Sequence, residues 1–214
     1  MSDVWSDRAD QYRTSAIHSA GEDLDLVVAW CEPAEGVNVL DVATGGGHVA
    51  RRLREEGANV VTVDPAPGMR ADVIAPAEHL PFADGSFDAV ATRLAAHHFA
   101  DVLGAVKEMA RVAADRVVVC DNTFVSEASE EADRVRDPSH VRNYGVGEWE
   151  SFFELAGLEI TEQRFLQRSL EIEPWLARVD CSPADAARVR ELLGDRIVDG
   201  WMQLPTLVIK GVKP

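Results

Sequence analysis

Several residue types and patterns are scarce in this chain, and each absence excludes a class of protein. Only three of the 214 residues are cysteines, and Cys31, Cys120 and Cys181 lie far apart without a CxxC or Cys/His spacing. A disulfide framework is therefore not indicated, and reduced thiols are expected. Neither HxxxH nor HExxH nor a clustered carboxylate set occurs, so we expect no metal site.

Long apolar runs and basic charge are also scarce. No apolar run reaches 18 residues, and the first residues hold neither a basic region nor an apolar core, so we expect a cytoplasmic protein without a membrane span. Lysine and arginine together number 21 against 37 acids, and the net charge of -16 disfavours DNA or RNA as partners. We expect a monomer or homodimer that acts on a small molecule.

One segment near the N-terminus carries most of the functional information. The apolar run 37–42 contains Asp41 and is followed by Gly45, Gly46 and Gly47 and then by a helical pattern. This order predicts a buried strand, a tight turn and a helix N-terminus whose backbone N–H groups can face a ligand. A second apolar run, 60–63, ends in Asp64, and an acid there suits ribose hydroxyls. The unit is typical of nucleoside binding.

Two cofactors compete for this unit. Gly45-x-Gly47-x-x-Ala50 fits the dinucleotide fingerprint of a nicotinamide or flavin enzyme, although such a match alone is unspecific. Asp41 favours S-adenosylmethionine instead. Four residues before Gly45, a carboxylate would repel a pyrophosphate but attract the ammonium group of the methyl donor, which carries no phosphate.

Apolar runs and amphipathic segments alternate along the chain, which predicts one α/β domain with a mostly parallel sheet. A helix is expected over Leu24–Cys31, and a shortened segment between Asp64 and Glu78 predicts a stub helix and a short edge strand at 71–74. The other predicted strands are 37–42, 60–63, 89–92, 116–120, 158–165 and 207–212. The other predicted helices are 45–55, 101–113, 147–156 and 184–194.

Several motifs, in order, resemble class I S-adenosylmethionine-dependent methyltransferases. Residues 41–48 (Asp-Val-Ala-Thr-Gly-Gly-Gly-His) resemble their first motif, 64–69 their acidic loop and 77–88 their adenine-side segment. Residues 92–99, together with 12–24 and 136–142, resemble the ubiquinone/menaquinone-biosynthesis-like branch, also called methyltransferase type 11. The motifs cover about 130 residues. They indicate the family far better than the substrate, because this fold hosts many chemistries.

The resemblance implies a Rossmann-like fold with a seven-stranded, mostly parallel sheet, an antiparallel last strand, helices on both faces and a shortened segment after the second strand. It implies a single domain over 1–214, with residues 1–30 as a helical lid and 123–147 and 174–196 as cap segments. The cofactor would be S-adenosyl-L-methionine, leaving as S-adenosyl-L-homocysteine. The reaction would methylate carbon or oxygen of a small-molecule acceptor.

The resemblance also assigns roles to individual positions. Asp41 would hold the methionine ammonium and Asp64 the ribose hydroxyls. The remaining cofactor-binding residues would be Tyr12 and His18 from the lid, Ala43, Gly45 and Gly47 in the loop, Met69, Ala77 and Glu78 around the adenine, and Arg93 and Leu94 near the reacting methyl group. Two positions depart from the family, which usually has Gly at Ala43 and Asp at Pro76.

Three histidines are candidates for catalysis. His97 and His98 follow a predicted strand end, where an imidazole with an ordinary pKa of about 6.5 suits proton transfer. His140, beside Arg136 and Arg142, is a third candidate. Helix capping, core packing and loop stabilisation are the alternatives for all three. At the level of the whole protein, a non-catalytic binder of the adenosyl cofactor and an NAD-linked oxidoreductase also stay open.

Overall fold

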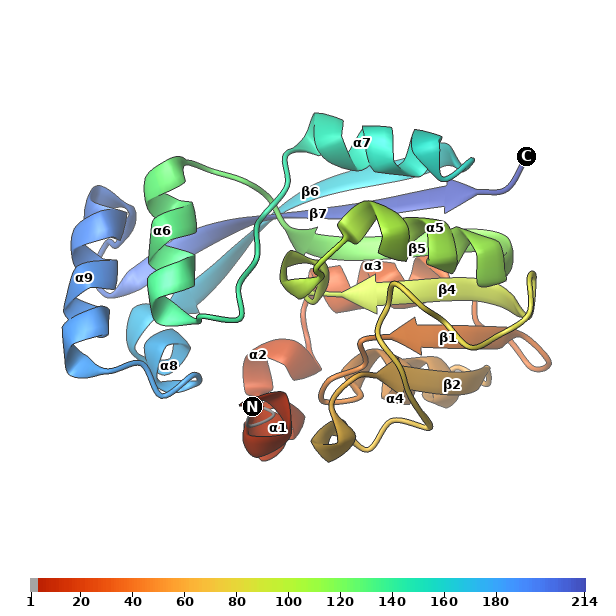
Figure 1. Cartoon of the computed structure of the whole chain (residues 1–214), viewed down its shortest axis with the longest axis horizontal. Helices are drawn as coiled ribbons and strands as arrows, with labels where there is room; N and C mark the ends of the chain where they lie inside the picture. The colour runs from red at the N-terminus through yellow and green to blue at the C-terminus, as the bar shows by residue number, and fades with distance from the viewer. Residues whose placement is uncertain (1–3) are drawn as a thin grey trace.

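The computed structural model describes residues 4–214, with the side chain of Ala16 excepted, and shows helices alternating with strands (Figure 1). The strands are β1 (Asn38–Val42), β2 (Asn59–Asp64), β3 (Val73–Ile74), β4 (Phe87–Arg93), β5 (Ala113–Asn122), β6 (Glu159–Glu171) and β7 (Trp201–Val212). The helices are α1 (Val4–Arg13), α2 (Ala16–Ser19), α3 (Glu22–Trp30), α4 (His48–Glu55), α5 (Val102–Val112), α6 (Glu127–Arg136), α7 (Val146–Leu155), α8 (Ile172–Ala177) and α9 (Pro183–Leu193), with 3-10 turns η1 (Pro67–Met69), η2 (Ala96–His98) and η3 (Gly194–Arg196).

The seven strands form one sheet in the order β3-β2-β1-β4-β5-β7-β6. The pairs from β3 to β5 are parallel, and β7 runs antiparallel to both of its neighbours. The predicted mostly parallel sheet with an antiparallel last strand is confirmed. The order reverses between β1 and β4, and in open α/β sheets a ligand crevice lies beyond the carboxyl ends of the strands at such a point.

Helices cover both faces of the sheet because successive strand side chains point to opposite sides. In β1, Val39 packs with α3 and α4, whereas Leu40 and Val42 pack with α5 and α7. The same alternation separates Val118 from Val119 in β5. The core strands are therefore buried on both faces, and their near-continuous apolar runs follow from this burial.

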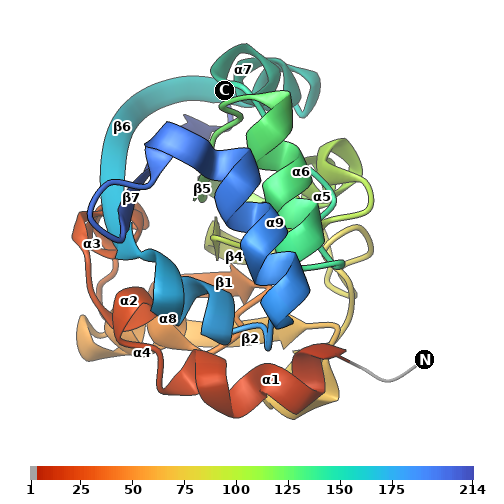
Figure 2. The same ribbon diagram turned by 90° about the vertical axis from the view of Figure 1, so that its left-hand side faces the viewer.

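The long strands β6 and β7 extend past the rest of the sheet and carry α8 and α9, beside which α6 lies (Figures 1 and 2). A separate apolar cluster holds this part together, and it includes Trp175, Leu176, Val189 and Met202. We refer to α6, α8, α9 and the adjoining ends of β6 and β7 as the cap. The predicted strand 158–165 ends too soon for β6, and the predicted strand 207–212 begins too late for β7.

The segment after β2 is short, as predicted: η1 is its only helical turn among the described residues before the two-residue β3. The first three residues of the predicted lid lie outside the described residues. None of the helices in residues 4–214 combines the length and apolar character needed to cross a membrane.

Candidate active site

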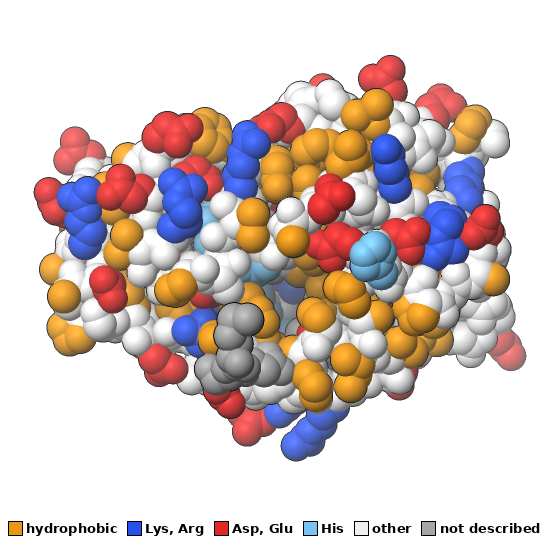
Figure 3. Space-filling model, viewed as in Figure 1, with side chains coloured by type: hydrophobic (Ala, Val, Ile, Leu, Met, Phe, Trp, Pro, Cys, Tyr) orange, Lys and Arg blue, Asp and Glu red, His pale blue; other side chains and the backbone are white. Residues whose placement is uncertain are grey.

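A cavity of about 340 Å³ opens at the carboxyl ends of β1, β2 and β4. Its volume falls in the usual range of small-molecule sites, about 300–1,000 Å³. The strand ends line one half, and α1, α2 and the cap line the other. Figure 3 shows the hollow near the centre of this face, with basic and histidine side chains visible inside it. Eleven of the twelve residues predicted to bind the cofactor line this cavity, and the exception is Gly47.

Asp41 is buried at the end of β1, with its side chain at the mouth of the glycine loop. Its Oδ2 atom accepts hydrogen bonds from Thr44 Oγ1 at 2.6 Å and from the backbone N–H of Ala50 at 3.1 Å. Burial nevertheless raises the pKa of Asp41 to about 6, because the two donors only partly offset the loss of hydration. A cation placed beside this carboxylate would restore its ionised form.

The glycine loop needs backbone conformations that suit glycine. Gly45 and Gly47 have φ values of 51° and 74°, and Ala43 also lies in the left-handed region with φ 54°. This geometry explains why related chains favour Gly at the position of Ala43, since a Cβ atom there carries strain. Leu94, at the end of β4, has the same φ of 54° beside the cavity, and non-glycine residues in this region cluster at functional sites.

Asp64 ends β2 and faces the glycine loop. Its Oδ2 accepts from the N–H of Gly45 at 3.0 Å, and its Oδ1 accepts from the N–H of Ala66 at 2.9 Å. Because each carboxylate oxygen has two lone pairs, a ribose hydroxyl can still donate to this side chain. Met69 in η1 is buried against Ala9 of α1 as well as lining the cavity.

The adenine side is formed by Pro76, Ala77 and Glu78. The Glu78 carboxylate is engaged elsewhere: its Oε1 accepts from the N–H groups of Ala100 and Asp101 at 2.9 and 3.2 Å. It therefore does not replace the carboxylate that related chains have at the position of Pro76.

The side chain of Arg93, which is predicted to lie near the reacting methyl group, makes its contacts with other parts of the protein. Its guanidinium contacts Asp23 of α3 at 2.7 Å and donates to the carbonyl of His18 at 2.8 Å, and its side chain is almost fully buried. It ties α2 and α3 to the end of β4. His18 lines the cavity, and burial followed by repulsion from Arg178 holds its pKa well below the ordinary value.

His97 is paired with a carboxylate that the sequence did not indicate. Its Nδ1 atom lies 2.6 Å from Oδ1 of the buried Asp121, at the end of β5. Burial lowers the pKa of His97, but the charge of Asp121 and this hydrogen bond outweigh burial, so the pKa lies above its ordinary value. Nε2 is then the ring nitrogen left for a substrate. Burial and the charge of His97 instead lower the pKa of His98 to about 3.

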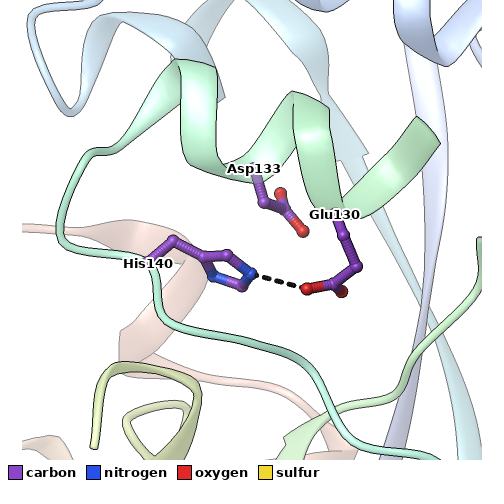
Figure 4. Close-up of side chains that lie close together, drawn as sticks. All are labelled: Glu130, Asp133 and His140. Atoms are coloured by element: carbon purple, nitrogen blue, oxygen red, sulfur yellow. Dashed lines mark hydrogen bonds and ion pairs between the residues drawn. The ribbon is translucent and has the colours of Figure 1, made fainter. Parts of the chain in front are cut away.

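His140 does not line the main cavity but a small neighbouring chamber behind His97. Its Nε2 lies 3.1 Å from Glu130, and Asp133 of the same helix stands beside them (Figure 4). These three residues place potential metal ligands within 4.8 Å of one another. Asn143 donates to both carboxylates at 2.8 and 2.9 Å. These hydrogen bonds connect α6 to the loop that follows it, although the buried Asn143 Oδ1 has no partner among the described residues.

Several cavity residues were missed by sequence reasoning. Arg168 and Arg178 lie far from every motif, and they reach the cavity only because β6 and α8 belong to the cap. Gly46 was quoted only as part of a motif, yet a Cβ atom there would approach the Tyr12 carbonyl oxygen to 2.6 Å. Among the tryptophans, Trp175 lines the cavity, whereas Trp149 is part of the core and Trp201 is exposed.

Comparison with known proteins identifies the family. The methyltransferase-domain family matches residues 40–120. The uncharacterized methyltransferase YcgJ of Bacillus subtilis is 31% identical over 204 residues, which cover 85% of this chain and 80% of YcgJ. The chain belongs to the class I S-adenosylmethionine-dependent methyltransferases. The crystal structure of YcgJ aligns with this methyltransferase at a TM-score of 0.81 with 25% identity, covering 89% of this chain and 97% of YcgJ.

The quinone-biosynthesis branch is also represented among the relatives of this methyltransferase. The demethylmenaquinone methyltransferase of Beutenbergia cavernae is 37% identical over 87 residues, which cover 36% of each chain. This match therefore covers only about a third of either chain. The predicted family, fold and enzyme class are confirmed by these comparisons.

Proposed function

We propose that this methyltransferase binds S-adenosylmethionine across the glycine loop and methylates carbon or oxygen of a small molecule held under the cap. The observation that carries the proposal is one cavity that joins the residues predicted for the cofactor to a second, cap-lined half. The acidic side chains Asp41, Asp64 and Glu78 belong to the first half. They suit a donor with two positive charges and no phosphate.

The residues of the first half fit such a cofactor. Asp41 is poised for an ammonium group, because its carboxylate is buried and only hydrogen-bonded to neutral donors. Gly45 lines the cavity, and a Cβ atom there would approach only the Ala43 carbonyl oxygen, at 4.0 Å, so the loop leaves space for a ligand. Asp64 presents its carboxylate to a ribose, and Met69 and Ala77 offer apolar surface to an adenine.

When bound, the cofactor would supply an electrophilic methyl group, to which the acceptor nucleophile bonds in line as the bond from methyl to sulfur breaks. The protein contributes alignment and exclusion of water. Tyr12 and His18 close one side of the cavity, and Trp175 and Leu204 of the cap close another. The donor and acceptor halves meet beside Leu94 and His97.

His97 is the best-placed residue to take a proton from an acceptor hydroxyl or ring carbon. Asp121 accepts from the backbone N–H of His97 at 2.7 Å as well as pairing with Nδ1, so both the loop and the ring are fixed. The proton would move to Nε2, and the resulting imidazolium would be stabilised by Asp121. His98 is a weaker base because its pKa is depressed.

Calorimetric titration with S-adenosylmethionine, S-adenosylhomocysteine and NAD tests the cofactor assignment. We expect micromolar binding of the first two and none of NAD. Binding of NAD alone would instead support an oxidoreductase and overturn our interpretation of Asp41. Binding of the adenosyl compounds without turnover on any acceptor of a broad panel would favour a binding protein that has lost catalysis.

A further inference from the structure

The cap half of the cavity is rich in arginine, although the protein as a whole carries a net charge of -16. Four arginines line the cavity: Arg93 from β4, Arg136 at the end of α6, Arg168 from β6 and Arg178 just after α8. They come from four separate elements, so a local run of basic residues in the sequence does not explain their convergence.

The available carboxylates do not neutralise these side chains. Asp23 serves two of them, since it contacts Arg93 at 2.7 Å and Arg168 at 3.7 Å. Arg136 donates to the carbonyl of Trp175 at 3.0 Å, and its guanidinium carbon lies 4.1 Å from the centroid of that ring. The side chain of Arg178 makes neither an ion pair nor a hydrogen bond with any residue of the described part of the chain, and only its backbone N–H donates, to the Pro174 carbonyl at 3.2 Å.

The other acids near the cap have partners, with one oxygen excepted. Asp137 Oδ1 accepts from Ser139 at 2.6 Å and pairs with Arg8 of α1 at 3.3 Å, whereas its buried Oδ2 has no hydrogen-bond partner among the described residues. Asp133 accepts from Asn143, and burial raises its pKa. Positive charge is therefore left over at Arg178. Burial and repulsion from Arg136 lower the pKa of Arg178 to about 10, which still leaves it charged at neutral pH.

The acids and arginines of the cavity are only partly segregated, since Arg93 lies at the end of β4 and Asp137 follows α6. Asp41 and Asp64 lie at the strand ends, whereas Arg178 follows α8 on the cap, whose cavity lining also includes Leu170, Trp175 and Leu204. A guanidinium presents a planar fork of donors that matches the two oxygens of a carboxylate. The apolar neighbours would contact a hydrocarbon or aromatic body. One unpartnered guanidinium matches one negative charge better than the double charge of a phosphate monoester.

We propose that the methyl acceptor carries a carboxylate, which Arg178 binds while Arg136 and Arg168 add positive potential and the cap contacts its apolar body. The inference rests on the proposed function, because it assigns the second half of the same cavity. It narrows the acceptor to an apolar or aromatic carboxylic acid.

The test is calorimetric titration of the S-adenosylhomocysteine-loaded protein with a panel of aliphatic and aromatic carboxylates, each beside its neutral amide and its phosphate-ester counterpart. We expect at least one carboxylate to bind tenfold or more tightly than its amide, and Arg178→Gln to abolish that preference. Arg164→Gln is the matched control, because Arg164 lies on β6 four residues before Arg168 and is exposed. It should leave the preference intact.

The cofactor titration separates this inference from the proposed function. If the wild-type protein fails to bind S-adenosylhomocysteine, the proposed function fails first. If it binds, but no carboxylate of the panel is preferred over its amide, only the acceptor assignment is overturned. A preference for phosphate esters would also overturn it. A tenfold loss of S-adenosylhomocysteine affinity in Arg178→Gln would also overturn the acceptor assignment, because Arg178 would then bind the cofactor's own carboxylate.

Discussion

At the scale of single residues, Asp41 is held in a state that favours ligand binding over stability. Its ordinary pKa in an unfolded chain is about 3.9, and burial raises the pKa to about 6 in the folded protein. An acid whose pKa is higher in the folded than in the unfolded state contributes most to the free energy of unfolding when it is protonated. That contribution declines as pH rises from about 4 to about 6, and at neutral pH the ionised group costs roughly 3 kcal/mol.

Asp41→Asn should therefore raise stability while weakening the cofactor site. At pH 7.5 we expect its free energy of unfolding to increase by about 1–2 kcal/mol, because the buried charge is gone and an amide oxygen can still accept from Thr44. Affinity for S-adenosylhomocysteine should fall at least tenfold. Denaturant unfolding and calorimetry measure the two effects. The stability gain should vanish near pH 4, and a gain that persists there would contradict a charge effect.

The His97–Asp121 pair makes a second prediction at this scale. Because the folded pKa of His97 is raised, its protonated ring stabilises the fold fully below about pH 6.5, and this stability is lost as pH rises through the folded pKa. Asp121→Asn removes the charge, so the titration midpoint of the His97 ring should fall.

The midpoint can be followed by NMR of the imidazole protons. Asp115→Asn is a control on the same strand, since Asp115 is exposed and pairs with Arg116; it should leave the His97 midpoint in place. An unchanged midpoint in Asp121→Asn would mean that Asp121 only positions the loop. In that case, the rate of catalysis that depends on neutral His97 would rise with pH over the same range in the wild type and in Asp121→Asn.

At the scale of elements, local pattern predicted most of the sheet but not the full length of its last strands. Strands β1, β4 and β5 could be predicted from the sequence because both faces of each strand are buried, which gives near-continuous apolar runs. The first half of β7 contains Gln203 and Pro205, and proline argues against a central strand. The outer half of β6, residues 165–171, lacks the apolar and polar alternation of a half-buried strand, because only Leu166 and Leu170 of this segment are buried.

The same distinction separates the predictable part of the site from the rest. Asp41, the glycines and Asp64 lie within a contiguous motif whose spacing follows from the strand–turn–helix geometry, so sequence alone located them. Arg178 reaches the cavity through the packing of the cap, and Asp121 reaches His97 because β5 pairs with β4. No spacing rule links them to His97 or to the glycine loop, because their separation in the sequence reflects topology rather than a local turn.

At the scale of the whole molecule, α1 bridges the sheet and the cap. On one side, the Gly68 N–H donates to Ser6 Oγ at 2.7 Å, and Arg13 donates to the Gly68 carbonyl at 2.9 Å. On the other side, Arg8 donates to the Val179 carbonyl at 2.8 Å (Figure 2). We propose that residues 4–20 act as a lid that closes over both halves of the cavity, and that α1 must leave for ligands to enter.

Gly68→Ala should undock this lid without unfolding the protein. An added Cβ atom would collide with the backbone and side chain of Ser6, and Gly68 does not need a left-handed backbone, so the effect would come from the collision alone. We expect hydrogen exchange in residues 4–13 to accelerate at least tenfold while β4 and β5 stay protected. Affinity for S-adenosylhomocysteine should fall several-fold, because Tyr12 and His18 leave the cavity. Gly147→Ala is the control, since its Cβ would meet nothing within 4 Å. Unchanged exchange in α1 of Gly68→Ala would show that α1 tolerates the collision and is not a tightly docked lid.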